Sequence, residues 1–298
     1  MKFSHAIGDH YLNQGMQDPI LISRDTRDSG KIIENLLSSV LIFKGIDFKL
    51  TGIMPTPGIS KLLEIGNYSL GIMITASHNP YQDNGIKLLG HNGFKLDLDS
   101  EKKIESLMQI ERDHEIKQEL VFSSDRYLES SFLDYAKPII DDFKTKNFDS
   151  KILIDCANGA FSKGIENLLA KHKNISYVDN APNGQNINLN CGALEANRLL
   201  DLVRRSDQDF GVAFDGDGDR AIFVSKEYGV IEIEKLAYLF FKMLDNNNKK
   251  VISTEICNLA LRHNLENIGA TLSETEVGDR FVVDSVNYTK ALFGFEPS

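Results

Sequence analysis

Apolar residues alternate between helical and strand spacing along the first part of the chain. Phe3, Ile7 and Tyr11 recur at four-residue intervals and predict a helix, and the short apolar run 20–22 that follows predicts a strand. Further strands are expected at 47–50 and 70–75, and a further helix begins at Thr56-Pro57. Another helix would bury one apolar face, formed by Ile32, Ile33, Leu36, Leu37, Val40 and Leu41. This alternation predicts an α/β domain with a mostly parallel sheet.

A similar alternation continues in the second half of the chain. A helix containing Tyr127, Phe132, Tyr135 and Ile139 would close the first domain, and the polar stretch 141–150 reads as a linker. Buried strands are expected at 151–155, 175–178, 210–214 and 221–224. The polar run 245–250 predicts an exposed loop before a strand at 251–253. We therefore expect three successive domains, at residues 1–145, 150–232 and 233–298.

Composition and charge narrow the class of protein. With 298 residues, 42% of them hydrophobic and 26% charged, the chain has the composition of a soluble globular protein with more than one domain. Its net charge of −10 argues against binding to nucleic acid or to an anionic membrane, because both carry negative charge. No apolar run approaches the roughly 20 residues of a membrane-spanning helix, and no targeting segment is visible.

The cysteines indicate a compartment. Cys156, Cys191 and Cys257 are odd in number and widely spaced, which fits neither a CxxC pair nor a disulfide framework. They are expected to be reduced thiols in a cytoplasmic protein.

The segment Phe214–Arg220 is the clearest candidate for a metal site. Asp215, Asp217 and Asp219 stand at every second position with glycines between them, and carboxylate oxygens in such a loop suit Mg²⁺ or Ca²⁺. An EF-hand is excluded because Arg220 and Lys226 occupy the positions that require Gly and Glu. The alternative is an acidic surface turn without an ion, which the repulsion between three close carboxylates disfavours.

A second candidate site follows the strand predicted at 70–75. Ser77 lies in the polar loop Thr75-Ala-Ser-His-Asn-Pro80, at the strand end where α/β sheets place ligands. A serine in a loop is more often a turn or capping residue, and the absence of a G-x-S-x-G elbow gives a hydrolase little support. Downstream, Lys87 in Asn84-Gly-Ile-Lys87 is suited to proton transfer or phosphate contact, or is simply solvated.

Together these three segments resemble the α-D-phosphohexomutase superfamily, and the resemblance extends over the whole chain. Residues 155–160, 182–188 and 277–282 resemble the phosphoglucosamine mutases in particular. The resemblance implies three-layer α/β domains I, II and part of III. It also implies an amino-sugar isomerase that interconverts glucosamine 6-phosphate and glucosamine 1-phosphate through a phosphoserine and a bisphosphorylated sugar. A phosphomannomutase or phosphoglucomutase, and a non-catalytic remnant that binds metal and phosphosugar, remain alternatives.

The same resemblance implies roles for single residues. Ser77 would carry the phosphoryl group, whose oxygen would complete the coordination of a Mg²⁺ held by Asp215, Asp217 and Asp219. Arg220 would stabilise the phosphoserine, and Lys87 and His78 would act in acid/base chemistry, although His78 is equally well a hydrogen-bonded loop residue. Glu296 and Ser298 would belong to the loop that recognises the sugar.

The chain departs from the family pattern at both ends. The family's first strand and its Arg-containing segment do not precede Phe3, and a fourth, phosphate-binding domain does not follow Ser298. Phe295 replaces the glycine that usually precedes Glu296, and Ile231-Glu-Ile-Glu234 replaces an Asp-Gly-Asp segment. The resemblance therefore implies a chain truncated at both ends, with low mutase activity on its own.

Overall fold

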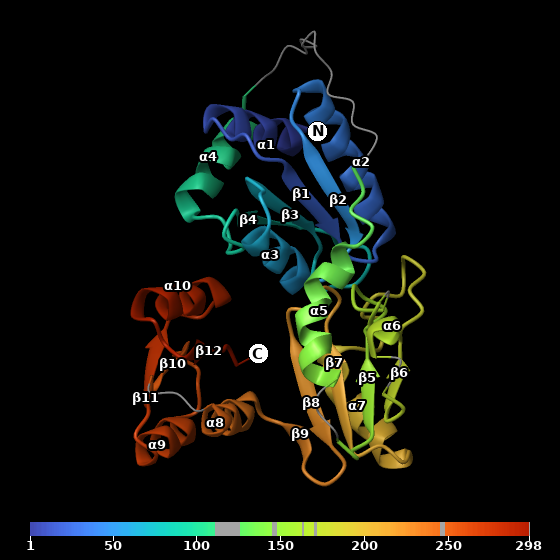
Figure 1. The fold of residues 1–298 in the computed structure, drawn as a ribbon, viewed down its shortest axis with the longest axis vertical. Coiled ribbons are helices and arrows are strands. Elements are labelled where there is room, and N and C mark those ends of the chain that lie inside the picture. Colours follow the sequence, from blue (N-terminus) through green and yellow to red (C-terminus); the bar gives the residue numbers. More distant parts are fainter. Residues whose placement is uncertain (111–125, 145–147, 163, 170–171, 245–247, 298) are drawn as a thin grey trace. The chain divides into compact units, whose positions relative to one another are not determined.

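The chain divides into two compact units, Met1–Glu227 and Tyr228–Ser298 (Figure 1). The structure, a computed structural model, describes residues 1–110, 126–144, 148–162, 164–169, 172–244 and 248–297. The loop predicted at 245–250 lies partly outside these described residues. Each unit is described by itself below.

The first sheet of unit 1 is parallel except at one edge. Strand β1 (Ile20–Arg24) lies between β2 (Phe48–Ile53) and β3 (Leu70–Ile74), and both neighbours run parallel to it. Strand β4 (Ile86–Gly90) pairs with β3 in the antiparallel direction. The prediction of a mostly parallel α/β sheet is confirmed.

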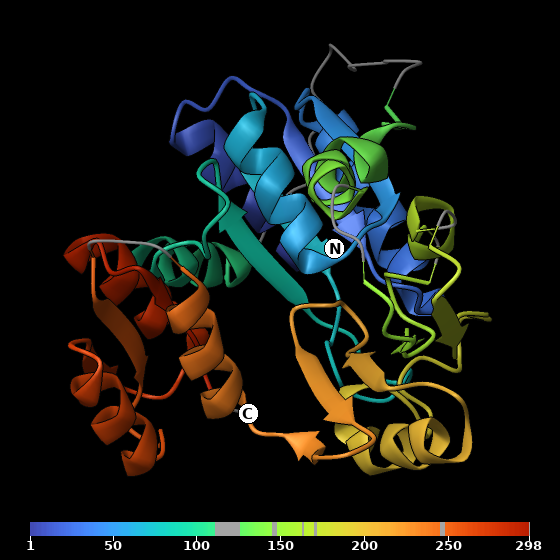
Figure 2. The ribbon, with the colours of Figure 1, turned by 60° about the horizontal axis from the view of Figure 1, so that its bottom comes forward.

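Helices cover both faces of this sheet because apolar side chains alternate along its strands. Ile20 and Ile22 on β1 belong to one buried cluster, whereas Leu21 belongs to the cluster on the opposite face. The first cluster includes residues of α1 (Lys2–Asn13), α2 (Asp28–Phe43) and α4 (Leu98–Met108). The opposite face is covered by α3 (Thr56–Ile65) and α5 (Ser131–Lys144), which lie side by side in Figures 1 and 2.

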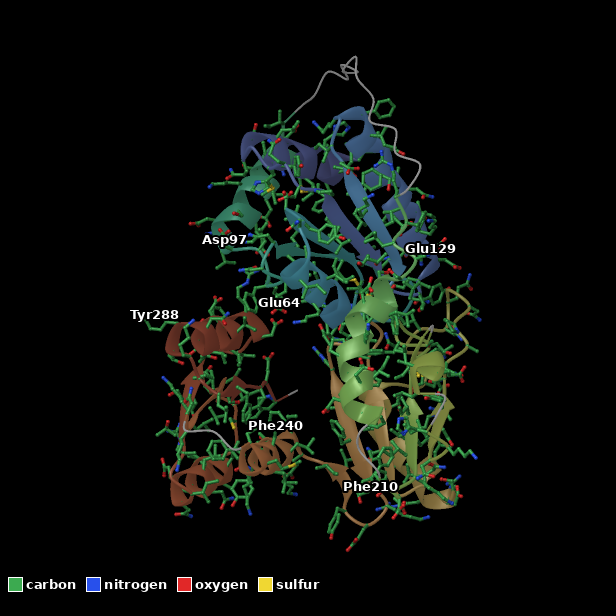
Figure 3. All side chains as sticks on the ribbon, viewed as in Figure 1. Glu64, Asp97, Glu129, Phe210, Phe240 and Tyr288 are labelled. Atoms are coloured by element: carbon green, nitrogen blue, oxygen red, sulfur yellow. The ribbon has the colours of Figure 1, made fainter. Side chains whose placement is uncertain are left out.

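Local sequence accounts for the starts of two of these helices. Helix α3 begins at Thr56 and carries Pro57 in its first turn, as predicted. Helix α4, which the sequence analysis did not predict, follows Asp97, labelled in Figure 3. The Asp97 carboxylate accepts a hydrogen bond of 2.8 Å from the backbone N–H of Ser100 and so caps the helix.

The apolar face predicted for α2 is partly wrong. Leu37, Val40 and Leu41 are buried, but Ile32 is 63% exposed and Leu36 is 40% exposed. At 3.6 residues per turn the six predicted positions spread over about half of the helix circumference. The sheet covers only the side of the helix that carries Leu37 and Leu41.

Helix α5 also differs from its prediction. It begins at Ser131, so Tyr127 lies outside it, in an isolated bridge with Leu50. The helix extends to Lys144 and therefore includes the first four residues of the linker predicted at 141–150. Phe143 prolongs it by packing into a buried cluster and against Phe148, at a distance of 5.2 Å between ring centroids. Residues 145–147 of the predicted linker lie outside the described part of the chain.

The second sheet of unit 1 repeats the arrangement of the first. Strand β5 (Ile152–Asp155) lies between β6 (Ile175–Val178) and β7 (Phe210–Phe214) and is parallel to both. Strand β8 (Ala221–Ser225) pairs antiparallel with β7. The remaining elements of this region are α6 (Ile165–Leu169), the 3₁₀ helix η1 (Ala193–Glu195) and α7 (Ala196–Arg205). In both sheets the loop at the carboxyl end of a parallel strand leads into an antiparallel strand.

Unit 2 has a small parallel sheet of its own. Its strand order is β11-β10-β12, and the core beneath it includes Val251, Leu261, Leu265 and Leu272. In chain order its elements are β9 (Gly229–Ile231), α8 (Ile233–Met243), β10 (Lys250–Thr254), α9 (Leu259–Asn267), β11 (Thr271–Thr275), α10 (Asp279–Thr289) and β12 (Phe293–Gly294).

Two expectations concerning the whole chain can be compared with the structure. Cys156, Cys191 and Cys257 are all buried and free of disulfide bonds, as predicted. Among the described residues, none of the helices has the length and apolar character needed to cross a membrane.

Candidate functional site

Ser77 lies three residues beyond the end of β3, in a loop that turns sharply. Its backbone adopts φ 51°, in the left-handed region that non-glycine residues rarely occupy. The Ser77 N–H donates a hydrogen bond of 2.9 Å to the hydroxyl of Thr75, which holds the turn. The Ser77 hydroxyl donates a hydrogen bond of 2.5 Å to Oδ2 of Asp215. The loop therefore presents Ser77 Oγ to the acidic loop that follows β7.

The three aspartates of that loop converge. One carboxylate oxygen from each of Asp215, Asp217 and Asp219 lies within 4.8 Å of the other two, and Asp215 and Asp217 are buried whereas Asp219 is exposed. The cluster is therefore open to solvent on one side only. These oxygens form a group that could hold a metal ion, as the spacing of the residues predicted.

The glycines of the acidic loop permit close approach to neighbouring segments. A Cβ atom on Gly216 would lie 2.6 Å from the carbonyl oxygen of Ser77. Gly218 has φ +71°, and a Cβ atom there would meet the ring of Phe161. Larger residues at either position would displace the loop, so both glycines are required sterically.

Two groups, one on the first sheet and one at the start of α3, bind the carboxylate of Asp217. Lys87, on β4, places Nζ 2.6 Å from Oδ2 of Asp217 and 2.6 Å from Oδ2 of Asp219. Thr56 donates its hydroxyl to the same Oδ2 of Asp217. The other oxygen, Oδ1, is buried and has no hydrogen-bond partner among the described residues. A buried carboxylate oxygen without a hydrogen-bond partner is suited to bind a cation.

The electrostatics of the cluster follow from burial and charge. Burial and the neighbouring charges of Asp217 and Asp219 raise the pKa of Asp215. Burial also acts to raise the pKa of Asp217, but Lys87 outweighs it and the net shift is downward. Burial alone would lower the pKa of Lys87, yet the two carboxylates that it contacts raise it above its ordinary value. Lys87 is therefore a charged ammonium at neutral pH.

His78 and Arg220 flank this arrangement. Nδ1 of His78 lies 3.4 Å from Oγ of Ser77, and burial together with the charge of Arg220 lowers the pKa of His78. The backbone N–H of Arg220 donates a hydrogen bond of 3.1 Å to Oδ1 of Asp215. The structure thus brings seven predicted residues together in unit 1: Ser77, His78, Lys87, Asp215, Asp217, Asp219 and Arg220.

The two residues predicted for sugar recognition lie outside unit 1 in the sequence. Glu296 is half-buried and lies in unit 2, after β12. Ser298 lies outside the described residues.

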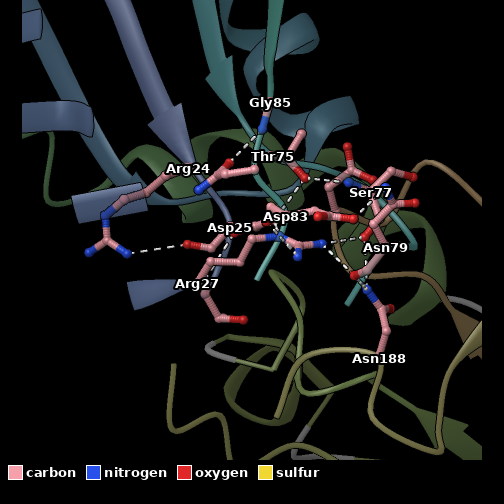
Figure 4. A network of polar contacts seen from close by, with 12 residues as sticks. Arg24, Asp25, Arg27, Thr75, Ser77, Asn79, Asp83, Gly85 and Asn188 are labelled. Atoms are coloured by element: carbon pink, nitrogen blue, oxygen red, sulfur yellow. Dashed lines mark hydrogen bonds and ion pairs between the residues drawn. The ribbon is translucent and has the colours of Figure 1, made fainter. Parts of the chain in front are cut away.

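Sequence reasoning missed several residues that hold the site. Arg27 is fully buried, and its guanidinium donates to the carbonyl oxygens of Ser77 and Asn79 at 3.0 and 2.8 Å (Figure 4). Asn188 donates to the same two oxygens from a distant segment. Arg27 comes three residues after β1, at the same sheet edge as Ser77, and this position was the available signal.

A second acidic group in unit 1 differs from the first. Asp155, Asp179 and Cys191 also have potential ligand atoms within 4.8 Å of one another. Nη1 of Arg198 lies 2.7 Å from Oδ2 of Asp179 and 3.4 Å from Oδ2 of Asp155, so a protein cation already balances these carboxylates. This group forms an internal ion pair.

Comparisons with known proteins agree with this geometry. Three models of the phosphoglucomutase/phosphomannomutase family match: the α/β/α domain I at residues 1–115, domain II at 130–229 and domain III at 233–298. A phosphoglucosamine mutase of an Exiguobacterium species is 35% identical, over 97% of this chain and 65% of its own length. That of Bartonella tribocorum is also 35% identical, over 100% of this chain and 67% of its own. The chain thus spans less than two thirds of the Exiguobacterium relative.

Solved structures share the fold. A structure described as a putative phosphomannomutase from Thermus thermophilus superposes with a TM-score of 0.83 at 21% identity, covering 100% of this chain and 69% of that one. An N-acetylphosphoglucosamine mutase of Aspergillus fumigatus, solved with GlcNAc-6P and magnesium, gives a TM-score of 0.58 at 16% identity, covering 97% and 53%. The family models and the two relatives show that this chain belongs to the phosphoglucomutase/phosphomannomutase family of the α-D-phosphohexomutase superfamily.

Proposed function

We propose that the chain carries the phosphoryl-transfer centre of a phosphoglucosamine mutase, an isomerase that interconverts glucosamine 6-phosphate and glucosamine 1-phosphate. The observation that carries this proposal is the position of the Ser77 hydroxyl, 2.5 Å from Asp215 at the rim of the three-aspartate cluster. The relatives named phosphoglucosamine mutase support the amino-sugar substrate.

Ser77 is the proposed carrier of the phosphoryl group. A hydroxyl of the bound sugar phosphate attacks the phosphorus on Ser77, so that the bond from phosphorus to Oγ breaks as the bond to the sugar oxygen forms. The hydroxyl proton passes to a base, and the product is a bisphosphorylated sugar. After this sugar reorients, Ser77 Oγ accepts its other phosphoryl group, and the released sugar hydroxyl takes back a proton.

Lys87, His78 and Arg220 are proposed to manage protons and charge during this exchange. Lys87 is proposed as an acid/base group beside the reacting oxygens. Its raised pKa keeps Nζ charged while Asp217 and Asp219 are its partners, and a cation bound to these carboxylates would lower that pKa toward the range in which Nζ can give up its proton. The lowered pKa of His78 leaves its ring neutral and able to accept a proton. Arg220 is proposed to stabilise the negative charge of the phosphate on Ser77.

The aspartate cluster is proposed to hold Mg²⁺. Asp215, Asp217 and Asp219 supply carboxylate oxygens, and the buried, unpartnered Oδ1 of Asp217 fits a hard cation. Bound there, Mg²⁺ would offset the charge of the phosphoryl group and so favour its transfer. The magnesium in the solved Aspergillus protein supports this choice of ion.

Substrate recognition and domain boundaries are also proposals. Glu296 is proposed to grip sugar hydroxyls through its carboxylate, with Ser298 in the same loop. The proposed domains are 1–145 for the phosphoserine, 150–232 for the metal loop and 233–298 for sugar recognition.

Mass spectrometry with a coupled assay tests the function. The protein is treated with glucose 1,6-bisphosphate and Mg²⁺ and should gain one phosphoryl group, which peptide mapping should place on Ser77. It should then form glucosamine 1-phosphate from glucosamine 6-phosphate. Ser77→Ala should abolish both signals, whereas Ser39→Ala, on the exposed side of α2, should change neither.

Each other outcome identifies an alternative. A phosphorylated protein that turns over mannose or glucose phosphates in preference to the amino sugar would be a phosphomannomutase or phosphoglucomutase, the activities after which the matching family models are named. Phosphate found at a residue other than Ser77 would refute the assignment of the carrier. Sugar-phosphate binding without any transfer would identify a non-catalytic binding protein.

A cytoplasmic location is proposed from the three buried free thiols, because free cysteines persist in a reducing compartment. Fractionation of the native cells tests it. Recovery of the protein outside the cytoplasmic fraction would refute it.

A further inference from the structure

Two carbonyl oxygens of the Ser77 loop each accept hydrogen bonds from two different side chains (Figure 4). Nη2 of Arg27 donates to the carbonyl of Ser77 at 3.0 Å and to that of Asn79 at 2.8 Å. Nδ2 of Asn188 donates to the same oxygens at 2.8 and 3.0 Å. We call this four-bond arrangement the loop clamp.

All five N–H groups of the Arg27 guanidinium donate hydrogen bonds to the Ser77 loop or to Asp25. Its side chain is completely buried, and the five N–H groups of a guanidinium form a rigid planar fork. Besides the two bonds of the clamp, Nη1 donates to the carbonyl oxygens of Pro80 and Asp83, and Nε donates to Oδ2 of Asp25 at 2.8 Å. The loop backbone therefore surrounds the guanidinium, and a lysine would lack the donors to replace it.

Asp25 connects Arg27 to the turn at Ser77. The same oxygen, Oδ2 of Asp25, accepts the hydroxyl of Thr75 at 2.8 Å. The hydroxyl oxygen of Thr75 in turn accepts the N–H of Ser77 at 2.9 Å. The loop is thus held at the N–H and at the carbonyl oxygen of Ser77, the two backbone groups that define its orientation.

Asn188 provides the other half of the clamp from a segment far along the chain. It lies in the stretch 182–188, and its own N–H donates to the carbonyl oxygen of Ala157 at 2.9 Å. It adopts φ 57°. Its single amide nitrogen has two hydrogens, and the clamp uses both. Ser77 is thereby tied to the segment after β5 as well as to β1.

The clamp explains how an unfavourable backbone conformation persists. Ser77 at φ 51° lies in the left-handed region, which is unfavourable for a residue with a side chain. Such a conformation survives only where the surroundings determine it. Without the clamp the loop would relax, and Oγ of Ser77 would leave its place beside Asp215.

We propose that Arg27 and Asn188 are positioning residues for phosphoryl transfer, which act by holding Ser77 in this conformation. The proposal rests on the proposed function, in which Ser77 carries the phosphoryl group. Neither side chain is assigned contact with the sugar or with the metal ion. Their removal should therefore lower the rate of transfer and leave the binding of Mg²⁺ unchanged.

The test compares Asn188→Ala with Asn190→Ala. Asn190 lies two residues away, is exposed, has φ 53° and makes no hydrogen bond to the Ser77 loop among the described residues, so it controls for loss of an asparagine at positive φ. Asn188→Ala should lower kcat by about tenfold to a hundredfold, with little change in KM, because misplacing a reacting group acts mainly on the chemical step. Asn190→Ala should keep kcat within about twofold of the unmodified protein.

A second measurement does not depend on catalysis. Amide hydrogen exchange at residues 76–79 should be faster in Asn188→Ala than in Asn190→Ala, while exchange in β5 and β7 stays unchanged. If Asn188→Ala and Asn190→Ala have the same kcat and the same exchange rates, the clamp proposal is wrong. If the unmodified protein transfers no phosphate but the exchange difference is found, the clamp holds the loop and it is the proposed function that fails.

Arg27→Lys adds a test of the guanidinium fork. It retains the positive charge beside Asp25 and removes the planar arrangement of donors. A loss of kcat as large as that of Asn188→Ala, with unchanged Mg²⁺ affinity by calorimetry, would support positioning through hydrogen bonds. Full activity of Arg27→Lys would show that charge alone is needed and would overturn the role assigned to the fork.

Discussion

The hydroxyl of Ser77 lies 2.5 Å from a carboxylate oxygen of Asp215, although 138 positions separate the two residues in the chain. Ser77 follows β3 and Asp215 directly follows β7, the equivalent strands of two sheets. Each loop lies at the carboxyl end of its strand and leads into an antiparallel partner. The contact therefore joins two similar loops, each of which belongs to its own sheet. A substitution in one loop should have a measurable effect on the other loop.

The metal cluster should depend on each of its carboxylates. Asp215→Asn, Asp217→Asn and Asp219→Asn each remove one charged ligand and should weaken Mg²⁺ binding by more than about tenfold, or about 1.4 kcal/mol. Asp217 should matter most because it is buried and Oδ1 has no other partner among the described residues. Titration calorimetry measures the affinities. Asp207→Asn, at an exposed carboxylate paired with Lys151, is the control, and unchanged affinity in all three cluster variants would exclude the site.

In the metal-free protein, the contribution of Asp215 to the free energy of unfolding should fall as pH rises. Burial raises its folded pKa above the ordinary value of 3.8, so the folded state holds the proton more tightly than the unfolded state. The resulting stabilisation is complete below 3.8 and is lost as pH rises through the folded pKa. The lowered pKa of Asp217 acts only below 3.8 and does not interfere.

Asp215→Asn is the variant that reveals this dependence. It has no carboxyl to titrate, so in the presence of a chelator its free energy of unfolding should decline less than that of the unmodified protein between about pH 5 and about pH 8. Urea denaturation at several pH values gives the comparison. Parallel pH profiles for the two proteins would contradict the assignment of a raised pKa to Asp215.

Lys87 should stabilise the metal-free cluster by offsetting the charges of Asp217 and Asp219. Lys87→Met leaves a buried carboxylate without its cation and should lower the free energy of unfolding by about 3 kcal/mol. Added Mg²⁺ should restore more stability to this variant than to the unmodified protein. Lys61→Met, which breaks an exposed pair with Glu64, should cost less than about 1 kcal/mol. Equal losses of unfolding free energy in both variants would show that the Lys87 contacts contribute no more to stability than an exposed ion pair.

Gly216 should tolerate no side chain. A Cβ atom there would lie 2.6 Å from the carbonyl oxygen of Ser77, a backbone atom that cannot move without the loop. Gly216→Ala should therefore destabilise the protein by about 1–3 kcal/mol and reduce phosphorylation of Ser77. Gly30→Ala is the control, because a Cβ on this helical glycine would meet Arg24 at 3.6 Å, an ordinary contact. If Gly216→Ala is as stable as Gly30→Ala, the two loops are less tightly packed than described.

The sequence by itself predicted the features that depend on neighbouring residues. The alternation of apolar runs indicated the α/β class and the order of the strands along the chain. Ser77, Lys87 and the three aspartates were found because each lies in a short segment with a recognisable pattern. The boundaries were less well predicted: the apolar pattern of α2 included Ile32, which is exposed, and residues 141–144, assigned to the polar linker, proved to be helical.

Only the tertiary structure decided which distant groups support the site. The sequence assigned no role to Arg27, and it marked the segment of Asn188 only by its resemblance to the phosphoglucosamine mutases. Their hydrogen bonds exist because the carboxyl ends of β1 and β3 lie side by side and the segment 182–188 packs against them. Thr56 bonds Asp217 only because two sheets meet there. A side chain acquires such a partner through the packing of whole elements, and the free energy of that packing is spread over many apolar residues. Local sequence therefore records the groups that are proposed to do the chemistry, and the fold selects the groups that hold them.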